Sequence, residues 1–240
     1  MKYLKTMILS LSVLLSATLL ANEAELKAKI EQLPMIKAIG ANITKVIVQN
    51  DVYHFNAEVK GDRPGKFEGF LTKDMNTMIM GKAYDTRTQA ELLIPMDLDV
   101  QKLKSVAAYK TGNGKNEYFV FTDPECPYCQ QLEKKITAVK SDVTVYTILF
   151  PLSFHKNAKS MCRYVLNQKD DGAKAKAMKE IANKDLSYQK ATYSAAKVTL
   201  LDDKIQKSLN EAAKIGIQGT PTILSAQGFK ANASDIIQAK

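Results

Sequence analysis

The sequence predicts an α+β protein, and three patterns support that class. Residues 52–60 alternate apolar and polar side chains, which is the period of a strand buried on one face. Residues 117–121, EYFVF, are almost continuously apolar, which suits a strand covered on both faces. A stretch rich in lysine and alanine, roughly residues 156–215, has helical character. We therefore expect a mixed chain that is divided into two successive domains.

Residues 1–21 have the layout of a secretory signal peptide. Lys2 and Lys5 precede an apolar run over residues 7–21, which is short for a membrane helix of about 20 apolar residues. We expect cleavage after Ala21, and an uncleaved membrane anchor is the alternative interpretation. The mature chain would have 219 residues and act outside the inner membrane, where disulfides persist.

Residues 22–90 read as a small antiparallel sheet with one helix. The helix is expected over residues 23–33, where Leu26, Ile30 and Leu33 share one face. Besides the strand over residues 52–60, which puts His54 on its polar face, short strands are expected around residues 43–49, 66–71 and 76–81. A unit of this size without a disulfide has a marginal core, so pairing with a second copy would stabilise it.

Residues 91–110 are expected to form a linker helix that runs into a strand, on the pattern of DLDVQKLKSVAAYK at residues 97–110. GNG at residues 112–114 predicts a hairpin turn before the apolar strand. The second domain then covers residues 111–240 and contains the long helical stretch.

Two cysteines spaced three apart, Cys126 and Cys129, follow the apolar strand in the sequence DPECPYCQQ. Helical spacing continues from Cys126 to Lys140, and Pro127 suits the first turn of a helix. Cys126 is then expected at the helix N-cap, where free backbone N–H groups and the helix dipole favour its thiolate. Cys129, one turn further, should be buried and keep its proton longer. The adjacent Glu125 carboxylate opposes ionisation of Cys126.

A redox pair explains these cysteines better than the alternatives. A zinc site needs two more ligands at suitable spacing, and Cys162 and two isolated histidines supply no second pair. Covalent haem needs a histidine after the second cysteine, where Gln130 stands. A structural crosslink across three residues closes too small a loop to stabilise much. We therefore expect thiol-disulfide exchange, with neither a metal nor another cofactor.

A second motif lies far along the chain, in GIQGTPTIL at residues 216–224. It places Thr220 and Pro221 just before an apolar strand, where a proline is tolerated and its peptide bond can be cis. An ordinary turn proline is the alternative interpretation. Together with the cysteine pair the motif indicates a redox site.

The charge pattern argues against a nucleic-acid partner. The net charge of +9 comes almost entirely from dispersed lysines, and the arginines are Arg63, Arg87 and Arg163. Nucleic-acid-binding proteins usually cluster basic residues on one face or carry a recognisable module. We expect no nucleic acid among the partners.

Three stretches carry a resemblance to a known family. FTDPECPYC (residues 121–129), GTP (residues 219–221) and GFLTKDMNTMIMGKAYD (residues 69–85) resemble the bacterial DsbC/DsbG thiol:disulfide interchange proteins, and the resemblance covers most of the mature chain. It implies a homodimer in which a cystatin-like domain dimerises. A linker helix then leads to a thioredoxin fold with a helical insertion.

The resemblance also implies roles for single residues. Cys126 matches the nucleophile and Cys129 the resolving thiol of the redox-active disulfide. Pro221 matches a cis-proline beside the site, and the backbone of Thr220 matches a substrate contact. Pro127 and Tyr128 lie between the cysteines, where we expect them to contact substrate and tune the redox potential. The implied partners are misoxidised exported proteins and a membrane reductase of the DsbD type as electron donor. The implied location of the protein is the periplasm.

The chain departs from the family in two respects. Relatives often carry a second disulfide in the insertion, but here Cys162 stands alone, and we interpret it as a small buried hydrophobe. Thioredoxins place a buried acid on the strand before their cysteines, whereas residues 118–121 are apolar. His54 and His155 are interpreted as surface or structural residues.

Three functions remain open from the sequence. The first is a disulfide isomerase or reductase that acts through a mixed disulfide on Cys126. The second is a disulfide oxidase of the DsbA type, although such proteins carry their cysteines near the mature amino terminus. The third is a dimeric periplasmic chaperone with secondary redox activity.

Overall fold

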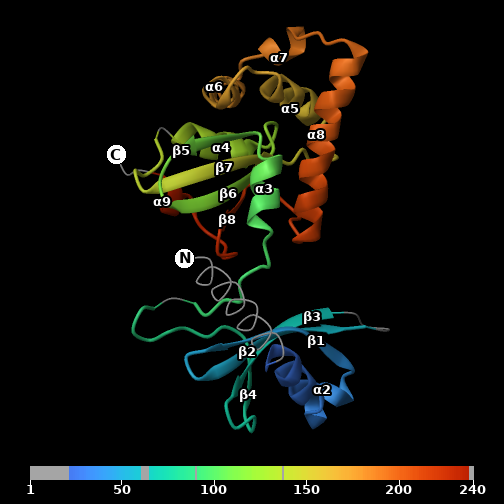
Figure 1. Cartoon of the computed structure of the whole chain (residues 1–240), viewed down its shortest axis with the longest axis vertical. Coiled ribbons are helices and arrows are strands. Elements are labelled where there is room, and N and C mark those ends of the chain that lie inside the picture. Colours follow the sequence, from blue (N-terminus) through green and yellow to red (C-terminus); the bar gives the residue numbers. More distant parts are fainter. Residues whose placement is uncertain (1–21, 61–64, 90, 137, 238–240) are drawn as a thin grey trace, which may run out of the picture. The chain divides into compact units, whose positions relative to one another are not determined.

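The computed structural model describes residues 22–60, 65–89, 91–136 and 138–237, so the expected signal peptide lies outside the described residues. These residues form two compact units, which meet in the chain between Ile94 and Pro95 (Figure 1). We call them unit 1 and unit 2 and describe each by itself. Within the described part of the chain, every helix is too short or too polar to cross a membrane.

Unit 1 is a four-stranded antiparallel sheet with helices packed against it. A helix over residues 22–31 and α2 (Pro34–Ala38) precede the strands. The strands follow in the order of the chain: β1 (Ala41–Gln49), β2 (Val52–Val59), β3 (Gly65–Thr72) and β4 (Met78–Met80). Between β1 and β2, Asn50 and Asp51 both have positive φ, as the two central residues of a tight hairpin turn require. The predicted helix and strands of this region are confirmed.

One face of the unit 1 sheet forms its core, which is centred on Phe55 and continues onto the helices through Ile30 and Ile36. His54 lies on the other face of the sheet and is fully buried. The prediction that it lies on a polar face is therefore wrong. Phe70 stands opposite His54 on β3, and the two rings stack at 4.1 Å between centroids. The pattern of β2 alone could not show this, because the covering ring comes from the neighbouring strand.

Unit 2 contains a mixed sheet in the order β5-β7-β6-β8. β6 (Asn116–Thr122) and β7 (Val143–Leu149) are parallel, and β5 (Tyr109–Gly112) and β8 (Thr222–Ser225) flank them antiparallel. The predicted hairpin at residues 112–114 is wrong, because β7 lies between β5 and β6. Gly114 instead allows a close approach: a Cβ there would meet the carbonyl carbon of Asp142 at 1.8 Å.

The strand β6 is covered on both faces, as its apolar run predicts. Phe119 and Phe121 pack on one side with Leu103 of the helix α3 (Val100–Val106). Val120 packs on the other side with Leu132. The linker helix expected over residues 91–110 is much shorter, because α3 starts only at its N-cap Asp99, whose side chain accepts a hydrogen bond from the Lys102 N–H at 2.9 Å.

Four helices separate β7 from β8, which confirms the helical stretch expected over residues 156–215. They are α5 (Ala158–Leu166), α6 (Asp171–Ala182), α7 (Ser187–Lys190) and α8 (Ala195–Lys214). A short helix α9 (Ala233–Ile236) follows β8. The helix after the cysteines, α4 (Pro127–Lys135), ends earlier than the expected Lys140, because the chain leaves helical geometry at Ile136 and Val139 pairs with Ile237 in an isolated bridge.

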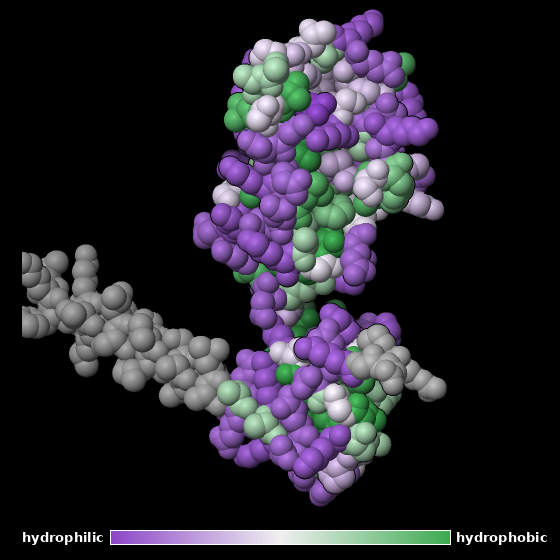
Figure 2. Space-filling view, turned by 90° about the vertical axis from the view of Figure 1, so that its right-hand side faces the viewer, coloured by the Kyte–Doolittle hydropathy of each residue, from purple (hydrophilic) through white to green (hydrophobic). Residues whose placement is uncertain are grey.

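The two units differ in charge. Residues 22–94 contain ten Lys and Arg and ten Asp and Glu, whereas residues 95–240 contain 22 basic and 15 acidic residues, a net charge of +7. Figure 2 shows a mostly hydrophilic face of unit 2, with hydrophobic residues gathered in a band through its middle. The dispersed lysines therefore belong mainly to the solvated surface of unit 2.

Candidate active site

Cys126 is the N-cap of α4, as the sequence predicts. Its backbone is extended (φ −64°, ψ 123°), and Pro127 occupies the first helical turn, where the missing N–H of proline has no cost. The Cys126 carbonyl accepts the first helical hydrogen bond, from the Gln130 N–H at 3.0 Å. The thiol therefore stands at the positive end of the helix dipole.

The GTP motif lies beside this thiol. The Cys126 S–H donates to the Thr220 carbonyl oxygen over 3.7 Å, and the Thr220–Pro221 peptide bond is cis. The sheet brings these distant segments together, because β8 begins directly after Pro221 and pairs with β6, which leads to Cys126. The Thr220 hydroxyl oxygen is buried and has no hydrogen-bond partner among the described residues.

Cys129 lies one helical turn behind Cys126 and is 2% exposed. Burial raises the pKa of Cys129 to about 11, although the nearby polar side chains of Thr220 and Thr122 and the backbone N–H of Asp123 oppose that shift. The Asp123 N–H donates to the Cys129 sulfur over 3.4 Å. Cys129 therefore keeps its proton at neutral pH, as expected for the inner cysteine of such a pair.

The two residues between the cysteines face outward. Tyr128 is 70% exposed, and Pro127 is exposed as well. Cys126 itself is only 5% exposed, so its neighbours leave little of it accessible to solvent. The residues predicted to contact substrate thus lie around the Cys126 thiol, from α4 on one side and from the segment before β8 on the other.

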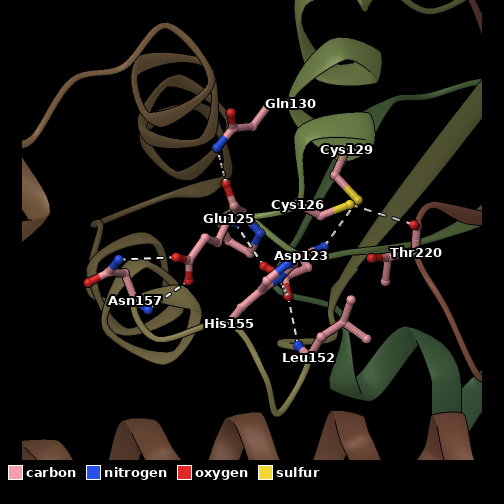
Figure 3. Close-up of polar contacts among 10 residues, drawn as sticks. Asp123, Glu125, Cys126, Cys129, Gln130, Leu152, His155, Asn157 and Thr220 are labelled. Carbon is pink, nitrogen blue, oxygen red and sulfur yellow. Dashed lines mark hydrogen bonds and ion pairs between the residues drawn. The ribbon is translucent and has the colours of Figure 1, made fainter.

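A buried acid, Asp123, was not predicted as a site residue. It follows β6 directly and is fully buried (Figure 3). Its carboxylate accepts hydrogen bonds from the N–H groups of Glu125 and Leu152, both at 2.7 Å, and contacts His155 Nδ1 at 2.8 Å. The sequence did hold a signal, since an acid between an apolar strand and a helix start is a candidate for capping backbone N–H groups. His155, which was expected to be a surface or structural residue, thus contacts the Asp123 carboxylate from the loop before α5.

Glu125 does not face the Cys126 sulfur. Its carboxylate accepts hydrogen bonds from the backbone N–H and the side-chain amide of Asn157, at 2.6 and 3.1 Å, at the start of α5 (Figure 3). The sequence placed this charge beside the thiol, but it is turned toward the helical insertion. A helix N-terminus attracts carboxylates because its first N–H groups are free.

Two polar residues fix the loop in front of α4. The Gln130 amide donates to the Pro124 carbonyl at 2.8 Å, and Lys184 Nζ donates to the Gln130 side-chain oxygen at 2.7 Å. Gln130 is itself buried, so both of its polar groups need these partners. The cysteine loop is therefore held from the helical insertion as well as from the sheet.

Cys162 is not part of the pair. It is fully buried on α5, as a small hydrophobe would be, and burial raises the pKa of its thiol well above the ordinary value, with a smaller effect from the Asp123 charge. All three cysteines are free thiols in this structure. Over the described ranges, no three His, Cys, Asp or Glu side chains gather as a metal site would require.

Residues 103–233 match the thioredoxin-like domain family. A curated relative, the probable thiol:disulfide interchange protein DsbC of Bordetella avium, is 28% identical over 97 residues, which are 35% of this chain and 32% of the relative. The protein of the same name from Bordetella pertussis is 37% identical over 59 residues, 25% of this chain and 18% of the relative. The matched stretches thus span a third or less of these relatives.

Solved structures of disulfide-exchange proteins are also similar. A disulfide interchange protein from Neisseria gonorrhoeae is 25% identical, covers 59% of this chain and 89% of its own, and has a TM-score of 0.42. DsbG of Helicobacter pylori is 14% identical, covers 83% and 98%, and has a TM-score of 0.39. The family match spans more than half of the chain and confirms the predicted thioredoxin fold. The chain belongs to the thioredoxin-like domain family and is similar to the DsbC and DsbG disulfide interchange proteins.

Proposed function

We propose that this protein is a periplasmic thiol-disulfide oxidoreductase that isomerises or reduces incorrect disulfides in exported proteins. One observation carries the proposal: Cys126 is the N-cap residue of α4, and its thiol lies 3.7 Å from the Thr220 carbonyl oxygen, with Cys129 buried behind it. An outer thiol at a helix N-terminus and a buried inner thiol divide the roles of nucleophile and resolving group.

The chemistry starts with the Cys126 thiolate. It attacks one sulfur of a substrate disulfide, forms a mixed disulfide, and releases the other substrate sulfur as a thiolate that takes up a proton. The Cys129 thiol then loses its proton and attacks the Cys126 sulfur. This step releases the reduced substrate and leaves a Cys126–Cys129 disulfide, so the substrate gains the two electrons that the enzyme loses.

Isomerisation follows the same first step without net electron transfer. A second thiolate of the substrate attacks the mixed disulfide, forms a new substrate disulfide and restores the Cys126 thiolate. The high pKa of Cys129 favours this route, because a resolving thiol that is rarely ionised leaves the substrate time to rearrange. When Cys129 does resolve the complex, an electron donor of the DsbD type would return the pair to its reduced form.

Unit 1 is proposed to pair two copies of the chain. Its net charge is zero, which favours association over mutual repulsion. Several large apolar side chains of unit 1 are exposed: Met35, Ile39, Val48, Ile79, Met80 and Tyr84. Exposed apolar groups of this kind mark a surface that gains by association.

The test is to trap the intermediate. A Cys129→Ser variant should accumulate a mixed disulfide with a misoxidised substrate, because nothing within the enzyme resolves it. A Cys126→Ser variant should accumulate none, and a Cys162→Ser variant should behave as the parent does. Mass spectrometry of the acid-quenched mixture identifies the linked cysteine. Trapping through Cys162, or the absence of any mixed disulfide, would refute the assignment of Cys126.

Two further measurements separate the alternatives. A Cys126→Ala, Cys129→Ala double variant should lose all rescue of a misoxidised client, whereas a chaperone with secondary redox activity would retain it. The redox state of the pair in the periplasm should be mostly reduced, whereas an oxidase of the DsbA type would be mostly oxidised.

A further inference from the structure

The loop between β7 and α5, residues 150–157, is fastened along the residues that lead to Cys126. The Phe150 N–H donates to the Thr122 carbonyl at 2.8 Å, and the Leu152 N–H donates to the Asp123 carboxylate at 2.7 Å. Further along, Asn157 donates twice to the Glu125 carboxylate. We call residues 150–157 the clamped loop, because these contacts tie it to the active-site turn at successive points.

The centre of this attachment is the buried Asp123 carboxylate. A buried carboxylate is costly unless donors surround it, and Asp123 has Leu152 N–H, Glu125 N–H and His155 Nδ1 within 2.8 Å. A displacement of the clamped loop would remove two of these partners, the Leu152 N–H and His155, from a carboxylate that is shielded from water. These contacts therefore hold the clamped loop in place beside the cysteine motif.

The clamped loop carries an apolar side chain that is exposed to solvent. Phe154 is 72% exposed, and its ring meets the His155 ring edge-on with centroids 4.6 Å apart. His155 in turn contacts Asp123, three residues before Cys126. Single exposed hydrophobes are common, but Phe154 belongs to a loop that is hydrogen-bonded to the residues leading to Cys126. Tyr128 adds a second exposed aromatic, on α4 next to Cys126.

We propose that Phe154 is a specificity-determining residue, which packs against an apolar side chain next to the substrate disulfide that Cys126 attacks. The inference rests on the proposed function and names its substrate class: disulfides whose neighbouring apolar residues are exposed. A correctly folded protein buries such residues, whereas a misoxidised chain leaves them accessible. A rigid aromatic side chain loses little conformational entropy on binding and suits this role.

The test uses two peptides with one disulfide each, which carry either Leu and Phe or Ser and Gln beside the attacked cysteine. A third substrate, 2-hydroxyethyl disulfide, has no side chains to recognise. The reduced parent should react about tenfold faster with the apolar than with the polar peptide, a range typical of one apolar contact. Phe154→Ser should bring that ratio close to one and leave the rate with 2-hydroxyethyl disulfide unchanged.

Two control variants show whether the effect belongs to Phe154. Phe154→Leu keeps an apolar side chain and should retain most of the preference. Phe229→Ser removes another partly exposed aromatic from unit 2, beyond the end of β8 that lies away from Pro221, and should leave the ratio unchanged.

The outcomes distinguish the two proposals. If the parent reacts with none of the three disulfides, the proposed function fails and this inference falls with it. If the parent reacts with all three but shows no preference, or if Phe154→Ser keeps the preference, only this inference is overturned. A loss of rate with 2-hydroxyethyl disulfide in Phe154→Ser would also overturn it, because the residue would then support the cysteine site itself.

Discussion

Unit 1 buries a histidine in its sheet, whereas unit 2 has a partly buried glutamate on α4, and burial shifts their pKa values in opposite directions. Burial lowers the pKa of His54, and the contact with Glu68 opposes part of that shift. Burial raises the pKa of Glu133 on α4 to about 7, and the charge of Lys179 on α6 opposes it. In both cases the interior favours the neutral form. A fall in pH below about 6.5 should therefore weaken unit 1, and a rise in pH from about 4.5 to 7 should weaken unit 2.

The two units also differ in the charge of their surfaces. Unit 1 has no net charge, whereas unit 2 carries +7 and shows a mostly hydrophilic face in Figure 2, although both units expose some large apolar side chains. Zero net charge favours association, and a charge well away from zero keeps a domain soluble. The difference in net charge supports our proposal that the chain pairs through unit 1 and binds its substrates on unit 2.

The largest expected effect comes from removing one fully buried aromatic ring from the core of each unit. Phe55 of unit 1 and Phe121 of unit 2 are both fully buried. Replacing either by alanine should cost about 3–5 kcal/mol of stability, because a cavity remains where the ring was. We expect each loss in the unit that holds the residue, as measured by hydrogen exchange of peptides from both units. If one substitution loosens both units to the same extent, they do not unfold separately.

A smaller effect is expected from Glu133→Gln in unit 2. The pKa of Glu133 is about 7 when folded and near 4.5 when unfolded, so the unfolded chain loses its proton first and the stability falls as pH rises between these values. The variant should be more stable than the parent by about 3 kcal/mol at pH 8 and by little at pH 4.

Denaturant unfolding at the two pH values measures this difference. The matched control is Glu180→Gln on α6, where Glu180 forms a surface pair with Lys176 at 3.7 Å. That control should show no comparable gain. An equal gain for Glu133→Gln at both pH values would mean that ionisation of Glu133 is not its cause.

The smallest expected effect belongs to His54 in unit 1. Its pKa is lower in the fold than the ordinary value of 6.5, so the unfolded chain takes up the proton first as pH falls. Unit 1 should therefore lose stability below about pH 6.5, and His54→Leu should reduce that loss. Glu68→Gln should increase it, because the carboxylate that supports the charged imidazole is gone. Hydrogen exchange of β2 at pH 7 and pH 5 measures this loss of stability. If His54→Leu loses as much stability between these pH values as the parent does, protonation of His54 is not the cause.

Sequence alone determined the features that depend on neighbouring residues. Pro127 and the apolar spacing of Cys129 and Leu132 start a helix at Cys126, because the missing N–H and fixed φ of proline suit a first turn. The alternation over residues 52–60 and the apolar run over residues 117–121 likewise specify strands, since side chains of a strand alternate between its faces. The helical stretch over residues 156–215 follows from its richness in lysine and alanine, which both favour helices.

Only the tertiary structure decided which segments meet. The chain separates Thr220 from Cys126 by 94 residues, and their contact requires β8 to pair with β6. The Asp123 contact with His155, the burial of His54 under Phe70 and the insertion of β7 between β5 and β6 also join distant segments. Local preferences act within a turn of helix or a few strand residues, whereas these contacts depend on which apolar faces are buried together across the whole fold.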